Sequence, residues 1–172
     1  MAWDQDIIDV EQAHPGGRAG WDGTGVYVAV LDSGLVPNWH DYFPPERIAL
    51  DLGRAFHSPV LGTPGSRSVI DTHSHGTHVT STILGYNLYD FGRIEGTAPG
   101  ATVVPVKVLG NNGTGWESSV IAGILYVARL KRDGVIGGPV VINMSLGSRN
   151  ASGGLRDAIR HAIGAGVLVV AS

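Results

Sequence analysis

The chain has 172 residues, of which 43% are hydrophobic and 16% are charged, and its formal net charge is −3. This length and apolar fraction are enough for one domain with a hydrophobic core. The small net charge gives no electrostatic reason to expect nucleic acid as a partner. No apolar run approaches the roughly 18 residues of a membrane span, so no membrane partner is expected. Because the chain has no cysteine, disulfides, thiolate catalysis and cysteine-ligated metals are excluded.

Nearly continuous apolar runs predict four β-strands, at residues 25–31, 102–109, 140–146 and 167–171. A shorter run at residues 48–50 predicts one more. The runs lack strict alternation of apolar and polar residues. This is typical of strands that are buried on both faces, as in parallel sheets.

Apolar residues at helical spacing predict helices over residues 116–128 and 155–163, and a third from His75 to about Leu84. Thr114 and Glu117 have the spacing of a capping box at the start of the first of these helices. Strands that alternate with helices predict an α/β fold with a mostly parallel sheet and helices on both faces.

In such sheets, functional residues gather at the carboxyl ends of the strands. Asp32 directly follows the first predicted strand, and residues 145–147 end the third. The chain stops at Ser172, where the fourth strand ends. We therefore expect residues 1–172 to form a domain that is incomplete at its C-terminus.

Three segments carry residue types suited to catalysis. Asp32-Ser33-Gly34 places a carboxylate where a buried strand turns. The segment at residues 73–78 has three histidines in six residues, and His75 falls in the first turn of a predicted helix, where its ring has a defined position suited to a general base. Residues 141–147 form a strand whose end could offer backbone groups to an extended peptide.

These segments together resemble the subtilisin-like serine proteases. Asp32-Ser33-Gly34 resembles the aspartate motif of that family, and the run from His75 to Val79 resembles its histidine motif. Residues 96–101 and 106–109 resemble the segment and strand that follow, and residues 143–147 resemble the strand that binds substrate. The motifs occur in the family's order across nearly the whole chain.

The resemblance implies a three-layer αβα fold and roles for particular residues. Asp32 and His75 would be the catalytic acid and base, and His78 would be a structural residue behind the site. The peptide would lie in an extended conformation between two edges of a cleft. The implied substrate-binding residues are Gly113, Thr114, Gly115, Ser145, Leu146 and Gly147.

Two features of the family's active site have no counterpart in the sequence: the oxyanion asparagine and the nucleophilic serine, which lie further along the family's chains. We therefore expect residues 1–172 to be part of a catalytic domain that ends before both. The parent protein would be a serine endopeptidase that uses an Asp-His-Ser triad, and this chain alone would be inactive. The alternative is a non-catalytic fragment that acts in binding.

The resemblance also suggests partners and a location. A propeptide or the rest of the domain would contact the chain, and the protein would be secreted. The sequence from Met1 to Asp4 does not begin like a signal peptide. Residues 57–70 are expected to form an inserted surface loop, and Thr80 and Ser81 stand where the family commonly has Ala-Gly.

The sequence raises two hypotheses about metal ions, a structural calcium site and a catalytic zinc site. The chemistry itself requires no cofactor, but the family commonly binds structural calcium, for which Asp41 and Asn87 supply suitable oxygen atoms. The competing hypothesis is a metal hydrolase in which His73, His75 and His78 share one zinc ion. Thr77 argues against this, because the corresponding metallo-β-lactamase pattern has aspartate there.

Overall fold

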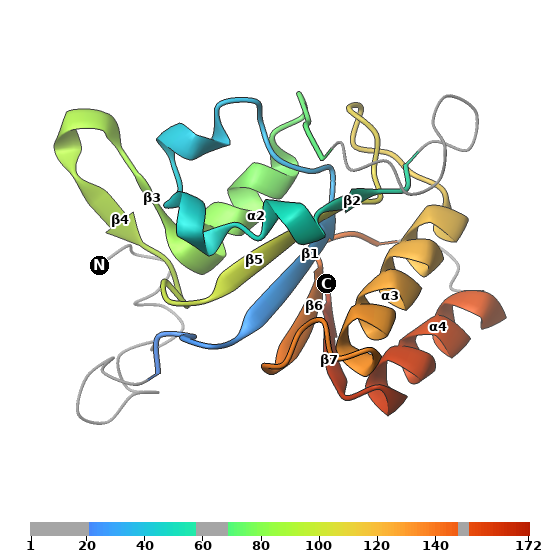
Figure 1. The fold of residues 1–172 in the computed structure, drawn as a ribbon. Coiled ribbons are helices and arrows are strands. Elements are labelled where there is room, and N and C mark those ends of the chain that lie inside the picture. Colours follow the sequence, from blue (N-terminus) through green and yellow to red (C-terminus); the bar gives the residue numbers. More distant parts are fainter. Residues whose placement is uncertain (1–20, 58–68, 148–151) are drawn as a thin grey trace.

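The fold is built on a five-stranded parallel sheet, which Figure 1 shows at the centre of the molecule. The computed structural model describes residues 21–57, 69–147 and 152–172. The strand order is β2-β5-β1-β6-β7, and every neighbouring pair runs parallel. The strands are β1 (Tyr27–Asp32), β2 (Arg54–Ala55), β5 (Thr102–Lys107), β6 (Val140–Met144) and β7 (Val167–Ala171).

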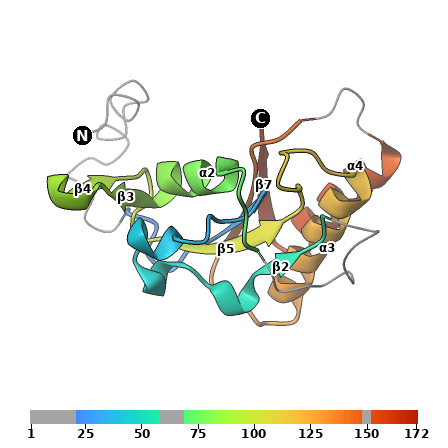
Figure 2. The same cartoon turned by 90° about the horizontal axis from the view of Figure 1, so that it is seen from above.

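Helices cover both faces of this sheet, as Figures 1 and 2 show. Helix α2 (His75–Leu84) lies on one face, and α3 (Glu117–Arg132) and α4 (Gly153–Gly164) lie on the other. A two-stranded antiparallel hairpin of β3 (Gly85–Asn87) and β4 (Arg93–Glu95) follows α2. The predicted three-layer αβα architecture with a parallel sheet is confirmed.

The side chains of β1 divide between the two layers. Val28 and Val30 pack in the core on the α2 side, whereas Ala29 and Leu31 pack in the core against α3 and α4. Successive residues of a strand point to opposite faces, so Asp32 must point toward α2. Burial of five of the six residues of β1 explains why its sequence is continuously apolar.

Four 3₁₀ segments complete the described structure: Trp39–Asp41, Pro45–Arg47, Leu50–Leu52 and Tyr89–Phe91. The strand predicted at residues 48–50 is wrong. Ile48 makes only an isolated bridge to Val103, because the chain turns at once into the third of these segments. Most of the expected inserted loop, residues 58–68, lies outside the described residues.

The capping box predicted for α3 is also wrong. The residue that caps α3 is Trp116, and no side chain donates or accepts a capping hydrogen bond there. Thr114 instead donates its hydroxyl to Asn112, because the loop before the helix folds back on itself. Helix α4 does have a side-chain cap, since Ser152 accepts from the N–H of Leu155. No helix of the described residues is both long enough and apolar enough to cross a membrane.

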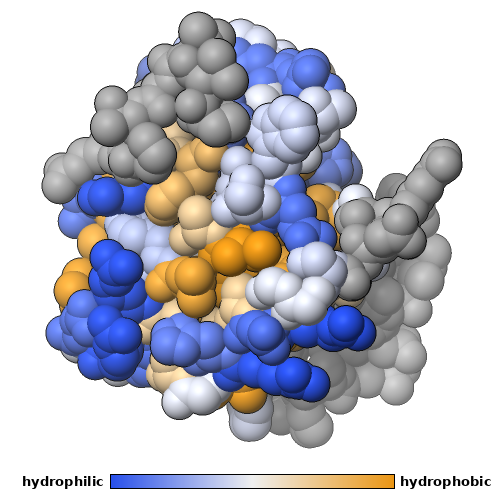
Figure 3. Space-filling model, turned by 90° about the vertical axis from the view of Figure 1, so that its right-hand side faces the viewer, coloured by the Kyte–Doolittle hydropathy of each residue, from blue (hydrophilic) through white to orange (hydrophobic). Residues whose placement is uncertain are grey.

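Strand β7 forms one edge of the described sheet. Leu168 and Val170 on this strand are 62% and 48% exposed. Figure 3 views the side that carries α3 and α4, and shows apolar residues at its centre with hydrophilic residues around them. An uncovered, apolar edge strand is a template for pairing with other chains.

We therefore predict that the 172-residue chain, when expressed by itself, self-associates through β7. Val170→Lys should reduce the association measured by light scattering after size-exclusion chromatography, because charge at an edge opposes strand pairing. Val135→Lys, at an exposed apolar residue outside the sheet, is the control and should have no such effect. A monodisperse parent chain that melts cooperatively would contradict the prediction.

Candidate active site

Asp32 is the last residue of β1 and has no exposed surface. Its backbone carbonyl accepts hydrogen bonds from the N–H groups of Val108 and Leu109, at 2.9 and 3.1 Å. Its carboxylate accepts from the N–H of Ser33 at 2.6 Å. The strand end is thereby fixed to β5, its neighbour in the sheet.

His75 is the first residue of α2, and its approach to Asp32 depends on two small residues. A Cβ atom on Gly76 would lie 2.3 Å from the carbonyl oxygen of Gly34, so only glycine lets the helix start pack this closely on the turn after β1. The N–H of Gly76 donates to the hydroxyl of Ser33 at 3.1 Å. A side chain from the strand end therefore satisfies one of the free N–H groups of the helix start.

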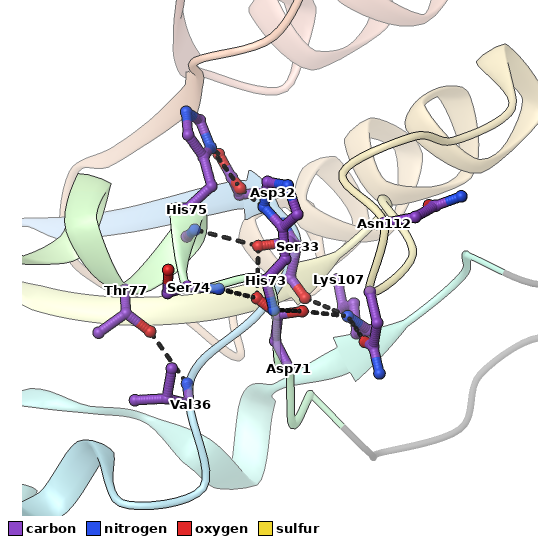
Figure 4. Close-up of polar contacts among 12 residues, drawn as sticks. Asp32, Ser33, Val36, Asp71, His73, Ser74, His75, Thr77, Lys107 and Asn112 are labelled. Carbon is purple, nitrogen blue, oxygen red and sulfur yellow. Dashed lines mark hydrogen bonds and ion pairs between the residues drawn. The ribbon is translucent and has the colours of Figure 1, made fainter.

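Asp32 and His75 form a close pair. Nδ1 of His75 lies 2.9 Å from Oδ1 and 3.0 Å from Oδ2 of Asp32. The His75 side chain is 41% exposed, and Figure 4 shows its other ring nitrogen pointing away from Asp32. A carboxylate at Nδ1 favours the tautomer with its proton there, which leaves Nε2 free to accept a proton as a general base.

The Subtilase family matches residues 23–172 of this chain. The chain belongs to the subtilase family.

Curated relatives have similar sequences along nearly the whole chain. The chain is 38% identical over 170 residues to the "Extracellular serine proteinase" of Thermus sp. (strain Rt41A), covering 98% of this chain and 36% of the relative. It is 37% identical over 172 residues to "Subtilisin Savinase" of Lederbergia lenta, covering 100% of this chain and 55% of the relative. The chain thus spans between about a third and about half of the length of these relatives.

Solved structures agree with this assignment. "Sphericase" matches with a TM-score of 0.69 and 32% identity, covering 87% of this chain and 46% of that chain. The "S41 Psychrophilic Protease" matches with a TM-score of 0.71 and 30% identity, covering 87% of this chain and 45% of that one.

The predicted substrate-binding residues of this subtilase lie in two segments on opposite sides of Asp32. Strands β5 and β6 are the two neighbours of β1, so the loop after β5 and the end of β6 flank the carboxyl end of β1. Gly113, Thr114 and Gly115 are in the first segment, and Ser145, Leu146 and Gly147 are in the second. Their roles in binding substrate remain predictions.

The loop after β5 packs closely on the histidine segment. Gly113 has a φ angle of +74°, and a Cβ atom there would lie 2.5 Å from Nε2 of His73. The carbonyl of Thr114 accepts from the N–H of Gly110 at 2.7 Å. These contacts fix residues 113–115 beside the ring of His73, whose centroid is 6.3 Å from that of His75.

Residues 145–147 lie beyond the end of β6, which stops at Met144 and not at residue 146 as predicted. Val30 pairs with Asn143, so extending this register places Ser145 level with Asp32. In the described part of the chain, no backbone hydrogen bond uses residues 145–147. Their backbone groups are therefore available to an added peptide strand.

The three histidines of the motif do not form a metal site. Within residues 21–57, 69–147 and 152–172, no three His, Cys, Asp or Glu side chains are grouped to hold a metal ion. His78 is exposed and does not pack behind the site as expected. Because the described residues offer no such group of three ligands, the zinc hypothesis is wrong.

The calcium site remains a prediction. Asp41 and Asn87 lie on neighbouring segments, because the N–H of Asn87 donates to the carbonyl of Tyr42 at 2.9 Å. However, the carboxylate of Asp41 already accepts from Asn38 at 3.2 Å. It is also 3.5 Å from the ring of His40. The Asp41 carboxylate is thus already engaged by its neighbours, whereas calcium takes six to eight oxygen ligands.

The sequence analysis missed a buried polar cluster beneath the pair, formed by Ser33, Asp71 and Lys107 and shown in Figure 4. Asp71 accepts from the hydroxyl of Ser33 at 2.7 Å and from Lys107 at 3.3 Å. It also accepts from the N–H groups of His73 and Ser74, both at 2.9 Å. A lysine inside the apolar run of residues 102–109 was the signal that could have revealed this cluster.

The charges in this cluster shift one another's pKa. Burial raises the pKa of Asp71, but the hydrogen bonds from His73 and Ser33 and the charge of Lys107 outweigh it, so that this pKa lies below its ordinary value. Burial lowers the pKa of Lys107, and the charge of Asp71 opposes this only in part.

Gly76→Ala should destabilise the protein by about 2 kcal/mol or more in urea unfolding, because the new methyl group meets backbone that cannot move aside. Gly164→Ala is the matched control, since a Cβ atom at that helical glycine meets nothing within 4 Å. It should be neutral or stabilising by about 0.5 kcal/mol. Equal effects of the two substitutions would contradict the packing described for α2.

Asp71 should stabilise the protein in a pH-dependent way. Its folded-state pKa is below the ordinary value of 3.8, so this contribution is present above that pH and is lost as the pH falls through the lower folded value. The loss of stability in Asp71→Asn, measured by urea unfolding, should therefore shrink as the pH falls below about 4. Asp157→Asn, at an exposed carboxylate, should show no such change, and a constant Asp71→Asn effect would disprove the linkage.

Proposed function

We propose that this chain supplies the aspartate and the histidine of an endopeptidase that uses an Asp-His-Ser triad. The observation that carries the proposal is the contact of Asp32 with Nδ1 of His75, at 2.9 and 3.0 Å. Together with membership of the subtilase family, this geometry supports acyl transfer better than any metal-dependent chemistry.

In this reaction, Asp32 keeps the proton on Nδ1 and stabilises the imidazolium that forms. Nε2 of His75 takes the proton of a serine hydroxyl as the serine attacks the peptide carbonyl, and then gives it to the leaving amine. The serine would come from outside the described residues, in which the His75 side chain bonds only to Asp32. Ser33 is unsuitable, because its buried hydroxyl donates to Asp71 and accepts from Gly76.

The substrate would be a polypeptide in an extended conformation. It would lie between residues 113–115 and residues 145–147, which flank the carboxyl end of β1. Free backbone groups at residues 145–147 would pair with the peptide as an added strand. The remaining part of a catalytic domain, or a propeptide, would be a further partner. Secretion is proposed because a relative is named an extracellular proteinase.

The test uses the polypeptide in its full encoded length, with a fluorogenic peptide substrate. His75→Ala should abolish most activity, and Asp32→Asn should lower kcat by on the order of 10⁴-fold with little change in KM. The size of this effect comes from the known behaviour of subtilisin triad variants. A polypeptide that is folded but inactive would favour the alternative, a binding fragment.

The 172-residue chain is tested separately with an acylating inhibitor. We expect no burst of released leaving group, because an acid and a base without a nucleophile cannot be acylated. A stoichiometric burst from this chain without any added partner would show that a serine within it serves as the nucleophile.

A further inference from the structure

The buried cluster of Ser33, Asp71 and Lys107 joins three segments that each contribute to the proposed active site. Ser33 directly follows Asp32, and Asp71 lies in the turn that leads into His75. Lys107 is the last residue of β5. The three residues are 0%, 0% and 1% exposed, and neither the proposed proton transfers nor the proposed peptide binding uses any of them.

Asp71 holds the start of α2 in position. Ser74, which immediately precedes His75, has a φ angle of 68°, which is an unfavourable conformation for a residue other than glycine. One oxygen of Asp71 accepts the N–H of Ser74 at 2.9 Å, and the other accepts the N–H of His73 at 2.9 Å. These bonds stabilise the turn that delivers the His75 ring.

Ser33 connects this turn to the strand end. Its hydroxyl donates to Asp71 at 2.7 Å and accepts from the N–H of Gly76 at 3.1 Å. Ser33, which follows Asp32, is therefore bonded both to Asp71, which precedes His75, and to Gly76, which follows it. A change in the position of Ser33 would move the two members of the Asp32–His75 pair relative to each other.

Lys107 supplies the opposing charge. It pairs with Asp32 in the register of β1 and β5, and its ammonium group donates to the carbonyl of Ser33. It also donates to Asp71 at 3.3 Å and to Asn111 at 2.8 Å. Because burial of an unpaired ion costs several kcal/mol, Lys107 stabilises the fully buried carboxylate of Asp71 in addition to its hydrogen bonds.

The charges suggest a second role. Asp32 and Asp71 are both buried, and only Lys107 among the buried residues described carries a positive charge. Asp32, Asp71 and Lys107 together carry a net charge of −1 when all three are ionised. A proton on His75 brings the sum to zero, so the cluster balances the imidazolium that forms during catalysis.

We propose that Asp71 and Lys107 are positioning residues for the Asp32–His75 pair. They fix the end of β1 against the start of α2, and Lys107 cancels the charge of Asp71 so that His75 responds mainly to Asp32. This inference rests on the proposed function only for the catalytic roles of Asp32 and His75. Its geometry stands on the contacts of the cluster.

The test follows the imidazole signals of His75 by NMR, as a function of pH, in the full encoded polypeptide labelled with ¹⁵N-histidine. Lys107→Met leaves Asp71 with three hydrogen-bond donors and therefore ionised, but without its opposing charge. The added negative charge favours the imidazolium. The titration midpoint of His75 should therefore move to higher pH by about half a unit or more.

Two further variants serve as controls. Asp71→Asn with Lys107→Met removes both charges and should return the His75 midpoint to within about 0.2 pH unit of the parent. Lys131→Met replaces the only other lysine, whose ammonium group donates to the carbonyl of Gly138. This variant should leave the titration midpoint of His75 unchanged. An unchanged midpoint in Lys107→Met, or an equal displacement in the double variant, would overturn the proposal.

The other groups near the cluster are followed in the same spectra. His73 lies 6.3 Å from His75 between ring centroids. His57 lies near both charges of the cluster. Its pKa is lowered mainly by burial and next by the charge of Lys107, whereas the charge of Asp71 opposes this shift. Lys107→Met should therefore also move the His57 midpoint to higher pH, and a His57 midpoint that stays in place would count against the described charge arrangement.

Ser33→Ala tests the positioning role without a change of charge, and remains informative if Lys107→Met does not fold. With circular dichroism unchanged, the low-field signal of the Nδ1 proton of His75 should broaden or disappear, because the Asp32 contact becomes variable. An unaltered signal would overturn the positioning role. These spectra need no substrate, so a lack of peptidase activity would contradict the proposed function and leave this inference standing.

Discussion

Asp71 carries a carboxylate with no exposed surface, and it accepts hydrogen bonds from four groups on three segments of the chain. The donors are the hydroxyl of Ser33, two backbone N–H groups before α2 and the ammonium group of Lys107. Burial of a charge is costly unless it is paired and fully hydrogen-bonded. The observed arrangement of these segments satisfies this charge, and the same arrangement brings His75 to Asp32.

The sheet provides the frame for this arrangement. Because successive side chains of a strand point to opposite faces, Asp32 shares a face with Val28 and Val30, which pack toward α2. Lys107 pairs with Asp32 in the neighbouring strand. The apolar residues of β1 and β5 thus fix the faces on which the polar residues at their ends appear, and the hydrophobic core indirectly determines where the charges meet.

Sequence patterns predicted the parts of the site that depend on local structure. The strand that ends at Asp32 and the helix that begins at His75 were both recognisable, because apolar burial and helical spacing leave clear periodic signals. The predicted capping box at Thr114 was wrong because the hydroxyl bonds within its own loop. Side-chain hydrogen bonds of this kind depend on loop geometry, and the residue types alone do not specify it.

The sequence by itself determined the α/β class and the family motifs, since each is a pattern of residues close together in the chain. It indicated Asp32 and His75, which lie 43 residues apart, only through the two separate motifs that carry them. Only the tertiary structure revealed the cluster around Asp71, whose partners Ser33 and Lys107 are 38 and 36 residues away. It also decided that His78 points to solvent while His75 contacts Asp32. These outcomes depend on which strands become neighbours in the sheet and on how a buried charge is neutralised. The sequence marks the cluster only by one lysine inside an apolar run and does not specify its partners.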